Sequence, residues 1–381
     1  MSVRPASVGS FLRAAPPDRL PEVGALYLRT RYPVDGVELL LSDLTTSALW
    51  PVLDPAAPAG GPLELRCFGS QQPVIDTSPP RVLLPLTTWG DRLGVLSVTL
   101  TVSPVPLGLV SELANVADEL ALALRAADKD TDRYRQVVRR QRLTMAAELQ
   151  WELLPGRSLG GERFRLAGQL DPAYAMYGDH YDWSVTDDRL TLTVLNGHGD
   201  GIEAALLTTV AVNAMRNARR SRANIVEQAE LASDAIYSRY GGDSHVATLL
   251  FEIDLADGTV EVVDAGSPRA LIAREGDIRT VDLEQQLPLG MFGDSRYETQ
   301  KLQLEPGDRL LVVSDGVHAA APGGQPPYGE SGLLSALRRT RLQPPAEAVG
   351  TVIRALRDYH SGADQEDDAV IVCLDWLRPT A

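Results

Sequence analysis

The sequence predicts an α+β protein with two domains joined by a helical connector. Three observations support this fold class. The chain has 381 residues, more than one hydrophobic core usually serves. Its first third alternates strand-like runs with one long amphipathic helix. Beyond residue 160, groups of strands are followed by pairs of helices, as in antiparallel sheets covered by helices.

Composition excludes several classes of protein. Hydrophobic residues make up 44% and charged residues 23%, which is ordinary for a soluble globular chain. The net charge of −15 argues against nucleic acid as a partner, because binding it requires a basic face. No apolar run approaches the roughly 20 residues of a membrane span, and the first residues lack a signal-peptide core, so we expect no membrane partner. Two widely separated cysteines, Cys67 and Cys373, favour a reducing cytoplasmic location.

Residues 1–20 are expected to form a flexible arm, since they contain Pro5, Pro16 and Pro17. Residues 21–126 read as the first domain. Val37–Leu44 has strand character, and 82–102 reads as two strands joined at Trp89-Gly90-Asp91. The Pro/Ala/Gly-rich stretch 51–62 is a predicted loop. A helix follows the hairpin, with apolar residues at helical spacing: Val110, Leu113, Val116, Leu120 and Leu124.

This first domain resembles a GAF sensory domain, an α/β fold. The resemblance rests on the runs VELLLSDL and LLPLTTWGDRLGVLSV. It implies binding of a small ligand or dimerisation. The sequence carries no ligand signature, so a sensor and an inert dimerisation module both remain open.

Residues 127–155 are predicted to form a helical connector. Tyr134, Val138, Met145 and Leu149 make an apolar stripe, and five arginines between 133 and 142 have no acid among them. One interpretation is a solvated helix face. The other is a parallel coiled coil between two subunits, which would make the protein a homodimer. Pro155-Gly156 ends the helix.

Residues 156–376 read as the second, larger domain. Two helices are expected between Gly201 and Tyr240 and two more between Gly332 and Tyr359. Asp257-Gly258, between two alternating runs, predicts a tight hairpin. The expected strands are 163–169, 190–195, 245–253, 259–263, 269–273, 309–313 and 369–374.

Acidic residues stand next to the ends of several of these strands. Asp179 lies in MYGDHYDW, where a predicted strand and turn precede it. Asp315 follows the strand of LLVVSDGV, and Asp367 and Asp368 precede the last strand. Each aspartate alone is typical of a turn. Together, acids at several strand ends can converge on one point and supply the oxygen ligands that Mg²⁺ or Mn²⁺ prefers.

Seven segments resemble, in order and spacing, those of the metal-dependent protein phosphatases. They are ELQWELLP, GDHYDW, NGHG, DAGSP, LPLG, LEPGDRLLVVSDGV and EDDAVIV. The similarity is greatest to the bacterial, protein phosphatase 2C-like branch that controls sporulation and stress sigma factors. It covers about residues 146–376 and implies an α-β-β-α sandwich.

The resemblance also implies a chemistry. In that family two Mn²⁺ or Mg²⁺ ions lower the pKa of a bridging water, and the hydroxide attacks the phosphorus of a phosphoserine or phosphothreonine. Carried over, Asp179 would bind one metal, and Asp315 and Asp367 the other. The main-chain carbonyl of Leu195 would be a further ligand. Gly178, Gly197, His198 and Gly199 would form the rim of the site.

One position departs from the family at the centre of the site. The bridging aspartate, which contacts both ions, is replaced by Val194. Valine has no lone pair, so one cation or none is expected here in place of two. Asn196 and Asp200 are the nearby polar residues. Neither is in register with the missing ligand, although a reshaped turn could bring Asp200 to the site.

Other positions differ from the family as well. Tyr177 stands where a glycine is usual, and a common Asn-Ala-Gly-His stretch reads Asp264-Ala265-Gly266-Ser267. His318, Ala319 and Ala320 follow the SDGV motif, where an acid is frequent. His198 could serve as a metal or acid–base residue, or it could hold the glycine turn by hydrogen bonds.

Two functions follow. The first is a metal-dependent serine/threonine protein phosphatase. It would act on a phosphorylated regulatory protein, such as an anti-sigma-factor antagonist, under control of the N-terminal domain. The second is a degenerate phosphatase-like domain that binds a partner without hydrolysis, which Val194 favours; a dimeric docking scaffold is a third reading.

Overall fold

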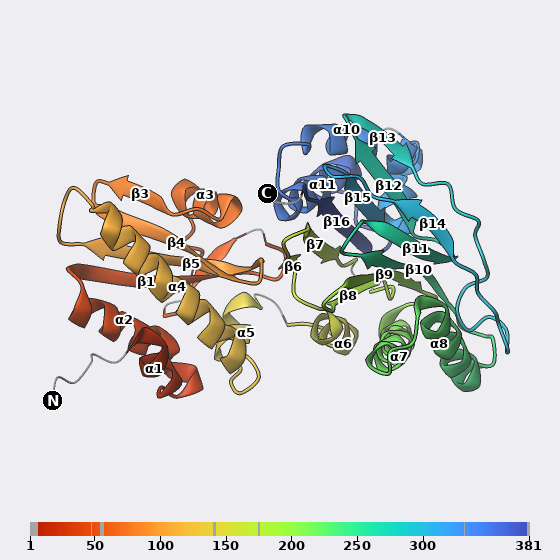
Figure 1. Ribbon diagram of the computed structural model, residues 1–381, viewed down its shortest axis with the longest axis horizontal. Helices are drawn as coiled ribbons and strands as arrows, with labels where there is room; N and C mark the ends of the chain where they lie inside the picture. The colour runs from red at the N-terminus through yellow and green to blue at the C-terminus, as the bar shows by residue number, and fades with distance from the viewer. Residues whose placement is uncertain are drawn as a thin grey trace. The chain divides into compact units, whose positions relative to one another are not determined.

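The computed structural model describes residues 7–46, 48–53, 57–139, 142–173, 176–330 and 332–378 (Figure 1). It divides into two compact units, Met1–Arg142 and Leu143–Ala381. The boundary falls inside the predicted connector. No helix of the described residues combines the length and the apolarity that crossing a bilayer requires.

The first unit is an antiparallel sheet with strand order β2-β1-β5-β4-β3. Its strands are β1 Val34–Ser42, β2 Leu49–Pro51, β3 Val74–Thr77, β4 Pro80–Thr88 and β5 Asp91–Leu100. Its helices are α1 Val8–Arg13, α2 Leu20–Arg31, α3 Pro62–Ser70, α4 Leu107–Ala127 and α5 Arg133–Val138. The hairpin β4–β5 turns at Trp89 and Gly90, which both have positive φ, as the sequence pattern indicated.

Helices cover both faces of this sheet. The apolar positions predicted for the long helix are all buried in α4, where they pack on residues such as Leu84 and Val98. On the opposite face, Cys67 of α3 packs against Leu40 and Leu83. This α/β arrangement agrees with the predicted fold class. The GAF identity of the unit stays a prediction.

The expected N-terminal arm is folded wherever the structure describes it. Residues 1–6 lie outside the described residues. From Ser7 on, α1 packs against α4, and Leu12 and Leu20 are 3% exposed in the core of the unit. Pro16 and Pro17 begin a short 3-10 turn there, and Leu12 and Leu20 on either side of them supply apolar surface that orders the segment.

The segment 127–155 differs from a single connector helix. Helix α5 ends at Val138 and α6 (Met145–Leu153) begins seven positions later; residues 140–141 lie outside the described residues. Arg133 of α5 makes two hydrogen bonds to Glu22 of α2, at 2.7 and 3.0 Å, and Tyr134 is buried in the first unit. Arg216 of α7 (Gly201–Arg220) donates to the Leu153 carbonyl at 2.7 Å, so α6 belongs to the second unit. The apolar stripe is therefore shared between the two units.

The second unit contains two antiparallel sheets, ordered β14-β11-β10-β9-β8 and β13-β12-β15-β16-β7-β6. The strands of the first sheet are β8 His180–Val185, β9 Arg189–Gly197, β10 Val246–Asp254, β11 Thr259–Ala265 and β14 Gln300–Gln303. Those of the second are β6 Ser158–Gly160, β7 Phe164–Asp171, β12 Arg269–Arg274, β13 Asp277–Thr280, β15 Arg309–Val313 and β16 Ala369–Trp376. The further helices are α7 Gly201–Arg220, α8 Ile225–Tyr240, α9 Asp315–His318, α10 Gly332–Arg339 and α11 Pro345–His360.

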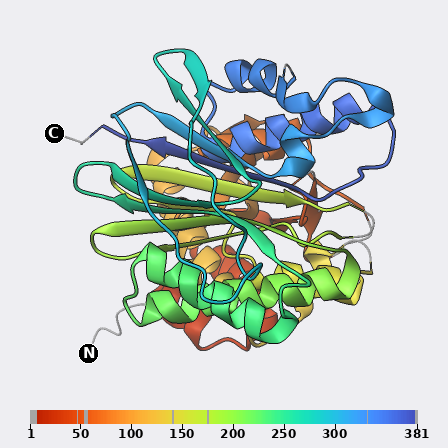
Figure 2. The same ribbon diagram turned by 90° about the vertical axis from the view of Figure 1, so that its right-hand side faces the viewer.

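Three apolar clusters define four layers in this unit. Alternate residues such as Leu192, Phe251 and Val372 fill the space between the sheets. Helices α7 and α8 bury Leu207 and Ile236 against the outer face of the first sheet. Helices α10 and α11 cover the second sheet in the same way (Figure 2). The α-β-β-α sandwich predicted for this region is confirmed.

The predicted elements of the second unit occur near their expected places, and four further strands are present. The hairpin at Asp257-Gly258 joins β10 to β11, with Gly258 at φ +81°. Strands β6, β8, β13 and β14 had no clear signal, since they are short or, in β8, dominated by aromatic and polar residues.

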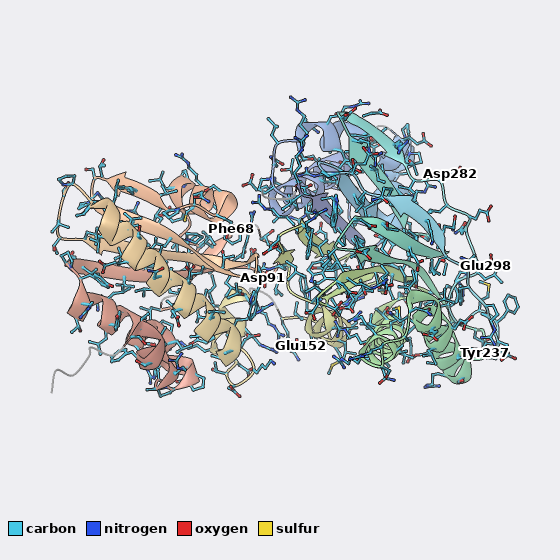
Figure 3. All side chains as sticks on the ribbon, viewed as in Figure 1. Phe68, Asp91, Glu152, Tyr237, Asp282 and Glu298 are labelled. Atoms are coloured by element: carbon cyan, nitrogen blue, oxygen red, sulfur yellow. The ribbon has the colours of Figure 1, made fainter. Side chains whose placement is uncertain are left out.

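Asp282 and Glu298 mark the long segment that joins β13 to β14 (Figure 3). Gln286 ties this segment together by bonds of 2.8 and 2.9 Å to the Glu298 main chain.

Candidate active site

The predicted acids come from both sheets of the sandwich. Asp179 follows β7 and a loop, in agreement with the sequence interpretation, and it directly precedes β8 in the first sheet, a strand that the sequence had not predicted. Asp315 follows β15, and Asp367 precedes β16, in the second sheet. Gly316 packs so closely on the 367–368 segment that a side-chain carbon there would overlap the Asp368 carbonyl oxygen. This close approach holds Asp315 beside Asp367.

Asp179 is the most buried of these acids. Its exposed fraction is 0%, and among the described residues neither carboxylate oxygen has a hydrogen-bond partner. Burial raises the pKa of Asp179 well above its usual range, and the charges of Asp367 and Asp315 raise it further; the Ser314 side chain partly offsets this rise. A carboxylate that is buried beside two like charges, with no hydrogen bond of normal geometry, is costly unless a cation compensates it.

Asp367 and Asp315 are partly exposed at the mouth of the same site. Burial raises the pKa of Asp367 to about 7, and the charge of Asp315 adds to the rise. The Asp367 carboxylate accepts the main-chain N–H of Asp368 at 2.8 Å. Gln365 donates to the carbonyls of Asp171 and Asp367, at 3.0 and 2.6 Å, and so ties the segment to the end of β7. The three carboxylates therefore act on one another electrostatically.

The donor set suits one hard divalent cation better than two. Three acids, one of which is the buried Asp179 carboxylate, supply the oxygen ligands and negative charge that such a cation needs. However, no group of three or more His, Cys, Asp or Glu side chains in the described residues already has the arrangement that holds an ion. Side-chain adjustment would have to complete the coordination. The assignment of Asp179, Asp315 and Asp367 as ligands remains a prediction.

Val194, at the position of the missing ligand, is fully buried. It lies in β9 opposite Tyr181 of β8 and Leu249 of β10, and its side chain belongs to the apolar core between the sheets. The apolar core between the two sheets therefore extends as far as the position of the missing ligand. Leu195 faces the helices instead, and the role of its carbonyl as a ligand stays a prediction.

Asn196 lies two residues beyond Val194 and therefore on the same face of β9. Its side-chain amide donates a hydrogen bond to Asp315. The main-chain N–H of Gly316 donates to the same carboxylate oxygen at 3.1 Å. The sequence interpretation had set Asn196 aside as out of register. The structure gives it a contact with a predicted ligand because Asp315 reaches across from the other sheet.

The glycine turn at the end of β9 contains residues that are predicted to form the rim of the site. Gly197 donates to the Gly178 carbonyl at 3.3 Å, and both Gly178 and Gly199 have positive φ, which favours glycine. His198 is exposed, and its ring stacks on His245 with centroids 4.9 Å apart. Its main-chain N–H donates to the His245 carbonyl at 3.1 Å. These contacts agree with a turn-holding role for His198. Asp200 precedes α7 and is exposed.

Two of the unusual positions contact each other. The His318 ring lies 3.2 Å from the Ser267 carbonyl oxygen and bridges α9 to the turn after β11.

Asp264 is 7% exposed, and burial raises its pKa to about 6. Its carboxylate accepts the Gly266 N–H at 3.0 Å.

Two antiparallel sheets between helix pairs, with acids from both sheets meeting at one edge, define the protein phosphatase 2C-like class. Residues 186–377 match the family described as "Stage II sporulation protein E (SpoIIE)", about half of the chain. The chain belongs to this family. The match contains Asp315 and Asp367, whereas Asp179 lies just before it.

Two relatives and one solved structure are similar to this chain. Protein IcfG of Synechocystis sp. is 21% identical over 265 residues, 62% of this chain and 42% of that protein. Phosphoserine phosphatase RsbP of Bacillus subtilis is 24% identical over 216 residues, 54% of this chain and 52% of that protein. The chain thus spans about half the length of these curated relatives. The SiaA-PP2C domain of Pseudomonas aeruginosa has a TM-score of 0.52 and 20% identity, covering 60% of this chain and 93% of that domain, which supports the fold.

Proposed function

We propose that this protein is a divalent-metal-dependent serine/threonine protein phosphatase. The observation that carries the proposal is the buried Asp179 carboxylate, which has no partner among the described residues and is coupled to Asp315 and Asp367. Membership of the SpoIIE family supports it, and one relative is named a phosphoserine phosphatase.

Asp179, Asp315 and Asp367 would hold one Mn²⁺ or Mg²⁺. When bound, the cation would supply the charge that activates water and neutralises phosphoryl oxygens. The protein's own residues would do the remaining work. Asp179 offers an oxygen ligand shielded from water, and Asn196 and Gly316 fix the orientation of Asp315. His198, at the predicted rim, is exposed and would be accessible to a protein substrate.

The substrate class we propose is a phosphorylated regulatory protein, such as an anti-sigma-factor antagonist. The N-terminal unit would regulate activity. The name of the relative RsbP supports phosphoserine as the target.

Val194 favours a second candidate, a module that binds a phosphoprotein without hydrolysing it. The valine is fully buried in the intersheet core, so no carboxylate stands at the shared corner of the site. Losing one ligand of both ions should cost at least as much as the roughly 10–100-fold that outer-shell losses cost.

Turnover of a phosphoserine peptide and of p-nitrophenyl phosphate with Mn²⁺ separates the two candidates. The proteins to compare are wild type, Asp315→Ala, Val194→Asp, and Val194→Thr as an isosteric control without a carboxylate. Turnover by wild type that Asp315→Ala abolishes would support the phosphatase. Silence of wild type with a gain in Val194→Asp, but not in Val194→Thr, would favour the binding module.

A further inference from the structure

Asp368 is a buried acid that the proposed metal site does not use. It is 0% exposed and lies between Asp367 and the first residue of β16. A charged side chain in such a place needs several hydrogen bonds to offset the loss of water. Its partners therefore indicate what it holds.

Main-chain N–H groups of the loop before β8 surround this carboxylate. Oδ1 accepts from Ala173 at 2.8 Å, and Oδ2 accepts from Tyr177 at 2.7 Å and from Gly178 at 3.2 Å. Residues 174–175 of the loop lie outside the described residues. The partners are nearly 200 positions away in sequence, so the bonds connect the start of β16 in the second sheet to the segment that leads into β8 of the first sheet.

The last of these donors is the residue before Asp179. Gly178 is also held from the other side, because its carbonyl accepts from the Thr208 hydroxyl at 2.7 Å and from the Gly197 N–H at 3.3 Å. The Asp368 main chain in turn packs directly on Gly316, next to Asp315. One residue thus contacts the main chain beside each of the predicted ligands.

We propose that Asp368 is a positioning residue, which fixes the Asp179 carboxylate relative to Asp315 and Asp367 through its bonds to the main chain of Ala173, Tyr177 and Gly178. The proposal rests on the proposed function for its consequence in metal binding. The claim that Asp368 holds the main chain of Ala173, Tyr177 and Gly178 does not depend on metal binding. Asp368 touches neither substrate nor cation in this role.

The test uses the full chain with Asp368→Asn and a matched control, Asp308→Asn. Asp308 is a buried acid, 2% exposed, at the opposite end of β15 from Asp315. It is held by Arg274, at 2.6 and 2.9 Å, and by the Glu305 N–H at 2.7 Å. Both substitutions remove a buried charge from a hydrogen-bonded network, so both are expected to lower the melting temperature.

Only Asp368→Asn should change the site. An asparagine has one acceptor oxygen, so it cannot keep both attachments of the loop. We expect amide exchange to become about tenfold faster or more at Ala173, or at Tyr177 and Gly178, whichever attachment the asparagine oxygen gives up; this is the effect of losing one hydrogen bond to a charged group. Calorimetric Mn²⁺ affinity should fall roughly 10–100-fold. Asp308→Asn should retain the wild-type affinity.

Wild-type Mn²⁺ affinity and exchange rates in folded Asp368→Asn would overturn the proposal, as would an equal loss of affinity in Asp308→Asn. If wild type binds no Mn²⁺, the proposed function fails, and the exchange rates alone decide the positioning role. If Asp368→Asn does not fold, amide exchange in the wild-type protein tests the positioning role. Slow exchange at Tyr177 and Gly178 supports the loop attachment, and exchange as fast as at exposed loop residues refutes it.

Discussion

Asp264 offers a prediction about stability that is separate from metal binding. The residue lies in β11, is 7% exposed, and has its pKa raised by burial to about 6 from 3.8. Because the folded-state pKa is above the unfolded one, the fold favours the protonated form. The associated stability is fully present below pH 3.8 and is lost as the pH rises through 6.

Replacing Asp264 by asparagine removes this penalty. An asparagine can still accept the Gly266 N–H through its side-chain oxygen, and asparagine is common at this place in the family. A shift of about two pKa units corresponds to an upper limit of about 3 kcal/mol at pH 8. The gain should shrink toward zero near pH 4, where both proteins are neutral at this position.

Thermal melting of wild type and Asp264→Asn between pH 4 and 8 measures the effect. For a unit of this size, each kcal/mol moves the midpoint by about 2–4 °C. The variant should therefore melt several degrees higher at pH 8 and nearly with wild type at pH 4. A difference that does not change with pH, or a variant that is less stable at pH 8, would refute the assignment of a buried carboxylate with a raised pKa.

Three further predictions follow from the site and the connector. Asp179→Asn should raise the melting temperature of the metal-free protein at pH 8, because it removes a buried charge without partners among the described residues. The same variant should lose all stabilisation by Mn²⁺. A variant that is destabilised and still responds to Mn²⁺ contradicts this prediction. Asn196→Ala removes the amide that orients Asp315, so calorimetric Mn²⁺ affinity should fall by about tenfold, as for other partners of a metal ligand. Unchanged or tighter binding would show that Asn196 does not support the site. Light scattering of the full chain should give a dimer if residues 127–155 pair between subunits, and a strictly monomeric mass would end the coiled-coil prediction.

The sequence predicted what local patterns determine. Alternating and helical apolar spacings located β9, β10 and α4, because these elements bury one face each. The ordered motifs located Asp179, Asp315 and Asp367 and the departure at Val194. Short or polar strands such as β8 were not predicted, because an alternating apolar pattern can be recognised only over several residues.

Contacts between distant segments could not be read in this way. Asp368 appeared only as a neighbour of Asp367, and nothing local indicates that its donors come from residues 173–178. Asn196 was judged from its register in one strand. Its contact depends on where the opposite sheet brings Asp315. The N-terminal arm was judged by its prolines, whereas Leu12 and Leu20 find their partners in α4 and the sheet.

Calorimetric titration with Mn²⁺ tests the central claim most directly. Wild type, Asp179→Asn, Asp315→Asn and Asp367→Asn should be compared under identical conditions. We expect about one ion per wild-type chain, because Val194 removes the ligand that two ions would share, and loss of binding in each variant. Absence of binding by wild type, or unchanged binding in any of the three variants, would contradict the account.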